Sequence, residues 1–453
     1  MELHVGIDDT DSLKSGCTTY LIACLIEILW KNGYKNFLDY PNIVRLNPNI
    51  PWKTRGNGAV CLRLEVPEES YEEIKELTVS FLEENFEEEV EETNPGIVFL
   101  KGIVPEPVKT FSLKALSNLV SLTETIKLVK KFGGEAFGFN KGRGIVGALA
   151  AIGETLDEDH TYEIITYRTT ENRGKPRKIS PESVQRMDLE TKPYTFNNID
   201  PETGRILVTP RGPDPVLFGI RGETPEIVKK AAGMVEVYEP IERWVIFRTN
   251  HGTDAHLKNI CRVKDVQPYT VVVVEGFVSR NPETIPGSHV IFGLNDGTGE
   301  IWCAAYEPTG KFRETVKNLI VGDRVRVYGG LRKAKPVKPL TINLEKIEIL
   351  ELTRKTVLQN PACPNCGKKM SSMGTGKGFR CKKCGYKNPK AEKVLVEIPR
   401  NNLKPGLYLP PPRAHRHLTK PIQRYGMEKP ERKNFYKQIH PKNFWGLGNP
   451  PKT

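Results

Sequence analysis

Four cysteines near the end of the chain impose the strongest constraint on its fold. They form two CxxC pairs, CPNC at 363–366 and CKKC at 381–384, with fourteen residues between them. Two such pairs supply four thiolates, the complete ligand set of one tetrahedral zinc ion. No coordination position is then left for water. The sequence therefore predicts a structural zinc site in a ribbon at 360–395, held by Cys363, Cys366, Cys381 and Cys384.

The remaining cysteines are scattered rather than paired, which favours a reducing compartment over a disulfide framework. They are Cys17, Cys24, Cys61, Cys261 and Cys303. No apolar run approaches the ~18 residues of a membrane span, and the N-terminus lacks a signal-peptide pattern. These features predict a soluble, cytoplasmic protein with no membrane partner.

The net charge of +12 is concentrated in the C-terminal part of the chain. Residues 361–393 hold nine Lys or Arg against Glu392, and residues 401–453 hold eleven against Glu428 and Glu431. Such segregation predicts a polyanionic partner, with a merely solubilising basic surface as the alternative.

Five strand-like runs at 269–351, with a turn at NDGTG and a short helix at 309–318, favour an OB-fold barrel over another small β-barrel. OB-folds often bind single-stranded nucleic acid. The tail beyond 395 has nine prolines after residue 400 and many basic and aromatic residues, so it cannot bury a core of its own. It either binds RNA by charge and stacking, or is an unstructured extension.

Three aspartates follow the first predicted strand, in the stretch HVGIDDTDS. Asp8, Asp9 and Asp11 repel one another unless they are solvated or neutralised by a cation. Two interpretations are open: an Asp-rich turn that caps the helix predicted at 18–31, or a magnesium site that accompanies ATP. Strand, acidic loop and helix in this order are typical of α/β enzymes.

Three further stretches are too specialised for plain scaffold. Two are basic and glycine-rich, as in phosphate-binding loops, but lack the Walker spacing. The first contains Lys53, Arg55, Gly56 and Gly58, and the second contains Lys141, Arg143 and Gly144. The third, TPRGPDPVLFGIRGE at 209–223, is predicted to be a rigid loop that holds a phosphate or small cation, or a stiff connector. It presents Arg211, Asp214 and Arg221. Strands at 161–169, 206–209 and 234–238 suggest a small α+β domain around it.

Taken in order, these motifs resemble the archaeal tRNA-Ile 2-agmatinylcytidine synthetase family. GIDDTDS, RLNPNIPWKTRGNGAV, GRGIVGALAAIG, PDPVLFGIRGE, ERWVIFRTNHGTDAHL, the OB-like strands and the CxxC pairs carry the resemblance, to about residue 395. It implies a multidomain α/β and α+β protein. The expected parts are a kinase-like domain at 1–135, a ferredoxin-like domain at 136–240, an OB-fold with linker at 241–352, the zinc ribbon at 360–395 and the basic tail at 396–453.

The resemblance also implies an activity. Family members use ATP to activate the 2-oxo group of the wobble cytidine in the CAU anticodon of an isoleucine tRNA, and agmatine then displaces the phosphate. ATP is cleaved to AMP, and a threonine that corresponds in position to Thr18 is phosphorylated. The implied catalytic residues are Asp8, Asp9, Asp11 and Thr18, with magnesium on the aspartates; Lys53, Arg55, Gly56, Gly58, Lys141, Arg143 and Gly144 are expected to bind ATP, and Arg211, Asp214 and Arg221 the other substrates.

Two other classes of function compete with this interpretation. A single-strand-binding protein made of OB-fold and zinc ribbon leaves the aspartate-bearing domain without a role. A different ATP-dependent RNA-modifying enzyme would use another small co-substrate. ATP consumption separates the first from the expected synthetase, and dependence on agmatine separates the second.

Overall fold

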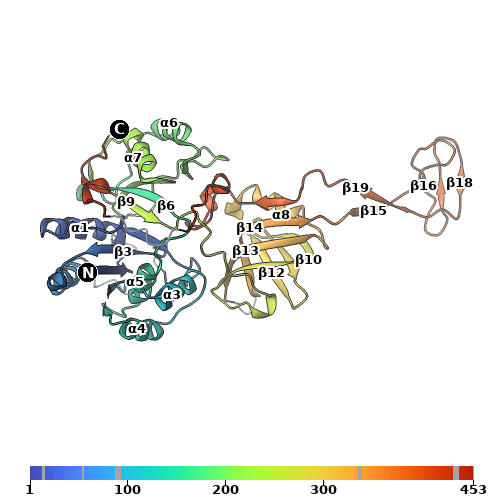
Figure 1. The fold of residues 1–453 in the computed structure, drawn as a ribbon. Helices are drawn as coiled ribbons and strands as arrows, with labels where there is room; N and C mark the ends of the chain where they lie inside the picture. The colour runs from blue at the N-terminus through green and yellow to red at the C-terminus, as the bar shows by residue number, and fades with distance from the viewer. Residues whose placement is uncertain (13–15, 54–55, 87–92, 334–338, 432–437, 452–453) are drawn as a thin grey trace.

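The computed structural model describes residues 1–12, 16–53, 56–86, 93–333, 339–431 and 438–451. Figure 1 shows an α/β body built on a large sheet, a β-barrel beside it, and a small ribbon at the far end of a two-stranded stalk. No helix in these ranges has the length and apolar character needed to cross a membrane.

The N-terminal half of the large sheet has strand order β5–β4–β1–β3–β2. Its strands are β1 (Glu2–Asp8), β2 (Asn42–Arg45), β3 (Gly58–Glu65), β4 (Gly96–Lys101) and β5 (Glu135–Gly138). Helices α1 (Thr18–Lys31) and α2 (Tyr71–Asn85) cover one face, and α3 (Glu106–Ser117), α4 (Leu122–Lys131) and α5 (Gly144–Gly153) cover the other. On β3, Val60 and Leu62 join the first core while Ala59 and Cys61 join the second. Burial on both faces explains why β3 reads as a nearly continuous apolar run.

The same sheet continues into the second half of the body. Its strands are β6 (Thr161–Arg168), β7 (Thr195–Phe196), β8 (Val216–Gly222) and β9 (Ile241–Thr249), accompanied by α6 (Pro181–Thr191) and α7 (Pro225–Met234). The two halves join where β2 pairs in parallel with β9, with Asn42 opposite Arg248. The kinase-like and ferredoxin-like regions therefore share one continuous sheet.

The strand pairing corrects the predicted limit at 240/241 and bears on the one at 135/136. The limit at 135/136 falls inside β5, which pairs with β4, and α5 packs on β1 and β4 rather than on the second half. Strand β9, expected to lie with the OB-fold at 241–352, pairs with β2 and β6 in the large sheet. Local sequence cannot reveal these limits because the pairing partners lie far away in the chain.

Two strands expected in the second half are also corrected. Residues 206–209 and 234–238 form only isolated bridges, Ile206 with Ile199 and Val237 with Ile179, because each segment meets its partner at one residue. By contrast, β8 lies within the stretch 209–223 that was predicted to be a loop. Its side chains Leu217, Phe218 and Ile220 are buried, and this burial stabilises the strand despite the flanking proline and glycines.

The barrel has the strand and helix order predicted for an OB-fold. Its strands are β10 (Val271–Ile285), β11 (His289–Asn295), β12 (Glu300–Ala305), β13 (Arg324–Arg332) and β14 (Thr341–Glu351), and α8 (Phe312–Lys317) lies between β12 and β13. Pairing of β12 with β14 closes the barrel. A stalk of β15 (Lys355–Gln359) and β19 (Val394–Ile398) leads to the ribbon strands β16 (Ser371–Ser372), β17 (Phe379–Arg380) and β18 (Lys387–Asn388) (Figure 1).

The C-terminal segment, which is the basic tail that begins at residue 396, returns from the stalk to the main body. Strand β20 (Gly406–Tyr408) pairs with β14 of the barrel, and β21 (Trp445–Leu447) pairs with β9 of the large sheet. Trp445 is buried beside Trp30, with ring centroids 5.5 Å apart. The alternative of an unstructured extension is therefore wrong for residues 396–431 and 438–451. The segment has no core of its own but completes the cores of two other parts of the chain.

Candidate functional site

The first aspartate stands at the end of β1, where the strand meets α5. Leu3, Val5 and Ile7 point into one core, so Asp8 faces the opposite side, toward α5. Its carboxylate packs against Gly147, where any Cβ would overlap the carboxylate oxygen. Burial and the neighbouring charges of Asp9 and Asp11 raise the pKa of Asp8 well above its ordinary value. A backbone hydrogen bond from Asp9 and the charge of Arg45 act in the opposite direction but do not outweigh these effects.

The third aspartate performs a different task. Asp11 Oδ1 accepts hydrogen bonds from the backbone amide of Thr18 at 2.7 Å and from its hydroxyl at 3.1 Å. Thr18 is the first residue of α1, so Asp11 satisfies one of the unpaired amides at the helix N-terminus. The helix-capping interpretation is thus confirmed for Asp11. The same contact holds the Thr18 hydroxyl against a carboxylate that is able to accept its proton.

The aspartates do not form a ready-made metal cage. In the described part of the chain, only the four ribbon cysteines bring three or more potential ligand atoms within 4.8 Å of one another. Magnesium bound to a nucleotide commonly takes only one or two protein carboxylates, with phosphate oxygens and water as its other ligands. The crowded carboxylates and the raised pKa of Asp8 fit such an open site.

A cavity of about 470 Å³ opens directly over the aspartate loop. Six residues predicted from sequence line it: Asp8, Asp9, Asp11, Lys53, Gly58 and Arg143. Apolar side chains from the loop after β2 and from the α3–α4 connection form the rest of the wall; they include Leu46, Ile50, Trp52, Leu119 and Leu122. The guanidinium of Arg143 lies 5.6 Å from the ring centre of Trp52. An apolar wall opposite carboxylates and cations suits a nucleotide with its metal.

A second cavity, of about 450 Å³, adjoins the first. Asp11 and Gly58 line both. Thr18, Gly56, Arg211, Asp214 and Arg221 line the second cavity as well, so the structure brings the stretch 209–223 to the aspartate loop. Asp214 is buried and accepts from Arg177, whereas Arg221 projects from β8 and donates to Glu163 at 3.0 Å.

A polar network supports the wall of the second cavity. Arg45 at the end of β2 donates to His251 Nε2, and His251 Nδ1 lies 2.9 Å from Glu163 Oε2. Burial alone would raise the pKa of Glu163, but Arg221 and His251 outweigh it and lower the pKa well below its ordinary value. His417 of the C-terminal segment stacks on His251, with ring centroids 5.1 Å apart. The network fixes two guanidiniums, those of Arg45 and Arg221, at the cavity wall.

The glycine-rich motifs mostly serve close packing. Gly56 lies against His417, because a Cβ there would come within 2.8 Å of His417 Nε2. Gly144 packs against the backbone of β1 and β4 and lines neither cavity, nor does Lys141, whose backbone amide donates to Asn94. Phosphate binding by Gly144 and Lys141 stays a prediction, and neither residue lines the two cavities at the aspartate loop. Arg55 lies outside the described residues.

Several cavity residues were missed at the level of sequence. Arg45, Glu163 and His417 line the second cavity, and His251 contacts them from behind; Arg45 and His251 lie in stretches that carry the family resemblance, but neither was singled out, because the elements that bring these four residues together are far apart in the chain. The α3–α4 connection was missed for the same reason. Only the arginine that ends the apolar run NIVR offers a local signal, as a charged residue at a strand end.

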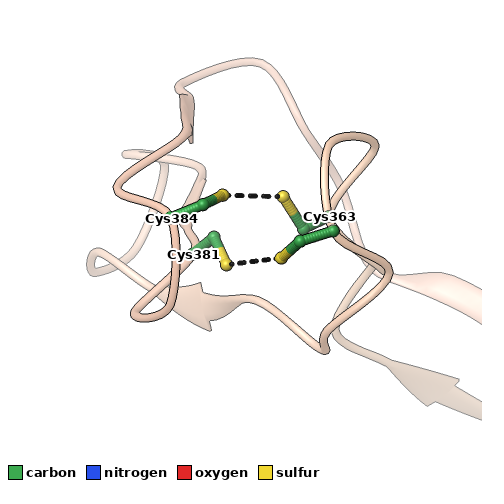
Figure 2. Close-up of side chains that lie close together, drawn as sticks. Cys363, Cys381 and Cys384 are labelled. Atoms are coloured by element: carbon green, nitrogen blue, oxygen red, sulfur yellow. Dashed lines mark hydrogen bonds between the residues drawn. The ribbon is translucent and has the colours of Figure 1, made fainter.

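The zinc ligands are arranged as predicted. The Sγ atoms of Cys363 and Cys384 lie 3.5 Å apart, as do those of Cys366 and Cys381 (Figure 2). A tetrahedral Zn–S distance of about 2.3 Å requires S···S separations of about 3.8 Å, so small shifts suffice to admit the ion. Met370 and Phe379 pack beside the cysteines in a minimal core.

Comparison with known families matches most of the chain. Residues 4–141 match the TiaS TCKD domain, residues 142–256 the TiaS FLD domain, residues 272–350 an OB-fold nucleic acid binding domain, and residues 360–401 the TiaS C-terminal zinc ribbon domain. The predicted OB-fold and zinc ribbon are thereby confirmed.

Similar proteins cover nearly the full length. The isoleucine tRNA 2-agmatinylcytidine synthetase TiaS of Methanocaldococcus jannaschii is 46% identical over 93% of this chain and 98% of its own length. A crystal structure of TiaS in complex with its isoleucine tRNA and ATP matches with a TM-score of 0.84 at 40% identity, over 96% of this chain and 100% of that one. A complex of TiaS with the same tRNA, AMPCPP and agmatine matches with a TM-score of 0.81 at 38% identity, over 94% and 97%.

Fold and site together define an ATP-dependent RNA-modifying enzyme, in which an aspartate-bearing catalytic domain is joined to an OB-fold and a zinc ribbon. With 46% identity to the Methanocaldococcus jannaschii protein over 93% of its length, the chain belongs to the isoleucine tRNA 2-agmatinylcytidine synthetase family, TiaS.

Proposed function

We propose that this protein uses ATP to join agmatine to carbon 2 of the wobble cytidine in the CAU anticodon of isoleucine tRNA, in the cytoplasm. The observation that carries the proposal is the junction of two cavities at Asp11 and Gly58. A nucleotide bound in the first cavity and a cytosine bound in the second would meet at this junction. The similar structures, which contain isoleucine tRNA with ATP or with AMPCPP and agmatine, support the assignment.

In the proposed arrangement, the first cavity takes ATP. Trp52, Leu119 and Leu122 provide apolar surface for the adenine, and Lys53 and Arg143 face the phosphates. Asp8, Asp9 and Asp11 would hold magnesium, which offsets charge on the polyphosphate during transfer. The Thr18 hydroxyl, held by Asp11 at the start of α1, would accept a phosphoryl group at the positive end of the helix dipole.

The chemistry requires activation before substitution. The cytosine 2-oxo oxygen attacks a phosphorus atom of ATP, an O–P bond forms, a phosphoanhydride P–O bond breaks and the remaining part of the ATP leaves, so that a poor leaving group becomes a phosphate ester. The primary amine of agmatine then attacks carbon 2, a C–N bond forms, the C–O bond breaks, and phosphate departs while the nitrogen loses a proton. Because the target base must leave the anticodon stack, an unpaired loop nucleotide is the natural substrate.

The second cavity suits the remaining substrates. Agmatine is a dication with many N–H donors, and Asp214 offers it a buried carboxylate. Asn197 Oδ1 is also buried there and receives no hydrogen bond from the described residues, so it is available as a further acceptor. Arg211 and Arg221 would face the RNA.

The decisive experiment incubates the protein with ATP, magnesium and transcribed isoleucine tRNA, with agmatine, lysine or no amine. Mass spectrometry of the wobble nucleoside should show a product only with agmatine. Thr18→Ala should slow the reaction if the threonine carries phosphate. Incorporation of lysine, or equal modification of a methionine tRNA with the same anticodon, would overturn the specificity. Unchanged ATP levels with intact RNA binding would favour a single-strand-binding protein.

Asp8→Asn should abolish ATP cleavage while leaving tRNA affinity within a few fold. The amide keeps the shape of the carboxylate beside Gly147 but loses its charge, so the metal loses a ligand. The thermal midpoint of the metal-free variant should equal or exceed that of the wild type, because the mutual repulsion of the aspartates is relieved. Full ATP turnover by the variant would remove Asp8 from the metal site.

A further inference from the structure

The C-terminal segment forms part of the second cavity. Pro412, Arg413, His415, Arg416 and His417 line that cavity together with the aspartate loop and β8. His415, Arg416 and His417 also line a smaller adjoining cavity of about 220 Å³, whose opposite wall includes Lys53. Residues far beyond the zinc ribbon thus stand beside the proposed reaction site.

Two ion-pair anchors hold this part of the segment in place. On one side, Arg413 donates to Asp200 at 2.8 Å and to Glu202 at 2.7 Å. On the other, the fully buried Arg424 donates to Asp159 at 2.9 Å and to Glu223 at 2.5 Å. The residues between the anchors are fixed in position before any ligand arrives, which reduces the entropic cost of binding.

Arg416 lies between these anchors and differs from both anchoring arginines. Its guanidinium makes no ion pair or hydrogen bond with any residue the structure describes. The buried Glu345, which it influences electrostatically, is itself bonded by His256 and Thr419. Cations also lie near Arg416. Burial lowers the pKa of Lys53 most, and repulsion from Arg416 and Arg332 lowers it further.

The second cavity as a whole carries unneutralised positive charge. Of its arginines, Arg45, Arg221 and Arg413 have the partners named above. Arg205 and Arg211, like Arg416, have no side-chain partner among the described residues, and both are exposed. Three such guanidiniums around one opening constitute a site for a polyanion, since arginine binds phosphate by paired N–H donors.

We propose that the C-terminal segment supplies Arg416 to a phosphate-binding site, shared with Arg205 and Arg211, that holds the RNA backbone next to the target nucleotide. The inference rests on the proposed function, which places the target base in the second cavity. ATP carries the same phosphate chemistry. RNA is favoured because none of the three arginines lines the first cavity, the one that contains Asp8 and Asp9.

The test uses full-length protein with single substitutions, because removing the segment would uncover the core around Trp445. Arg416→Gln is compared with Arg416→Lys and with the matched control Lys404→Gln, an exposed cation of the same segment that lines no cavity described above. Binding of isoleucine tRNA is measured over a range of salt concentrations, and ATP cleavage is measured without RNA. Thermal midpoints confirm that all variants are folded.

Arg416→Gln should lose about five- to tenfold in tRNA affinity, and the slope of log affinity against log salt should fall by roughly 0.7 to 0.9. Arg416→Lys should recover most of the slope, and Lys404→Gln should match the wild type. Unchanged affinity and slope for Arg416→Gln would overturn the inference, as would a raised KM for ATP without any effect on RNA binding. If the wild type binds tRNA but forms no agmatine product, the proposed function fails, and the binding result is judged separately.

Discussion

The zinc ribbon and the C-terminal segment are neighbours in sequence and both strongly basic, yet they are structured in opposite ways. The ribbon projects on its stalk, and its core consists of its own residues around Cys363 and Cys381. The segment that follows returns to the main body, where Arg424 and Trp445 are buried against residues from the first half of the chain, Glu223 and Trp30. Composition alone therefore does not indicate whether a basic segment is autonomous. The location of its stabilising partners does.

Zinc removal should produce the largest and most local effect. Chelation or Cys363→Ser should unfold the ribbon, because zinc binding contributes on the order of 10 kcal/mol to folding in such modules. Proteolysis should cut within 360–393 while ATP cleavage without RNA persists, since the ribbon lies at the far end of the stalk and lines neither the first nor the second cavity. Elemental analysis that finds no zinc in protein purified without chelator would refute this, as would loss of ATP cleavage.

Disrupting the anchor of the C-terminal segment should have a smaller but global effect. Arg424→Leu removes the cation that Asp159 and Glu223 share and leaves them Lys420 at 3.7 Å and Lys429 at 3.2 Å. Breaking a buried ion pair costs about 3–5 kcal/mol, and with these two lysines still present we expect the lower end of that range, about 3 kcal/mol. Guanidinium denaturation should show the loss in the main unfolding transition, with zinc still bound. Lys404→Gln serves as control. A loss below about 1 kcal/mol would mean that the segment is only loosely attached.

The second anchor should give the smallest effect, and one that depends on pH. Burial alone would raise the pKa of Asp200, but hydrogen bonds from Arg413 and from backbone amides lower it below 3.8. The carboxylate thus contributes stability above its unfolded pKa of 3.8, and this contribution disappears as the pH falls through the folded value. Arg413→Gln should cost on the order of 1 kcal/mol at neutral pH.

The stability difference between wild type and Arg413→Gln should therefore shrink in acid. Urea denaturation at pH 7 and near pH 3 provides the comparison. A difference that stays constant with pH would show that Arg413 acts by packing rather than through Asp200. The C-terminal segment would then have one ion-pair anchor, at Arg424, instead of two.

Sequence alone determined the features whose partners are local. The four zinc ligands lie in two short turns, the barrel strands follow one another along the chain, and the aspartate loop joins β1 to α1 directly. Periodicity and spacing are sufficient to read such contacts, because the residues that satisfy each group lie within a few tens of positions of it.

Only the tertiary structure decided what the aspartate loop faces and what the tail does. Asp8 is confined by Gly147, Asp11 meets Asp214 and Arg221 across the second cavity, and His417 stacks on His251 from the far end of the chain. These contacts join segments separated by more than a hundred residues, through the pairing of β2 with β9 and the return of the C-terminal segment. No local pattern encodes such pairings, because burial and charge neutralisation are properties of the assembled fold.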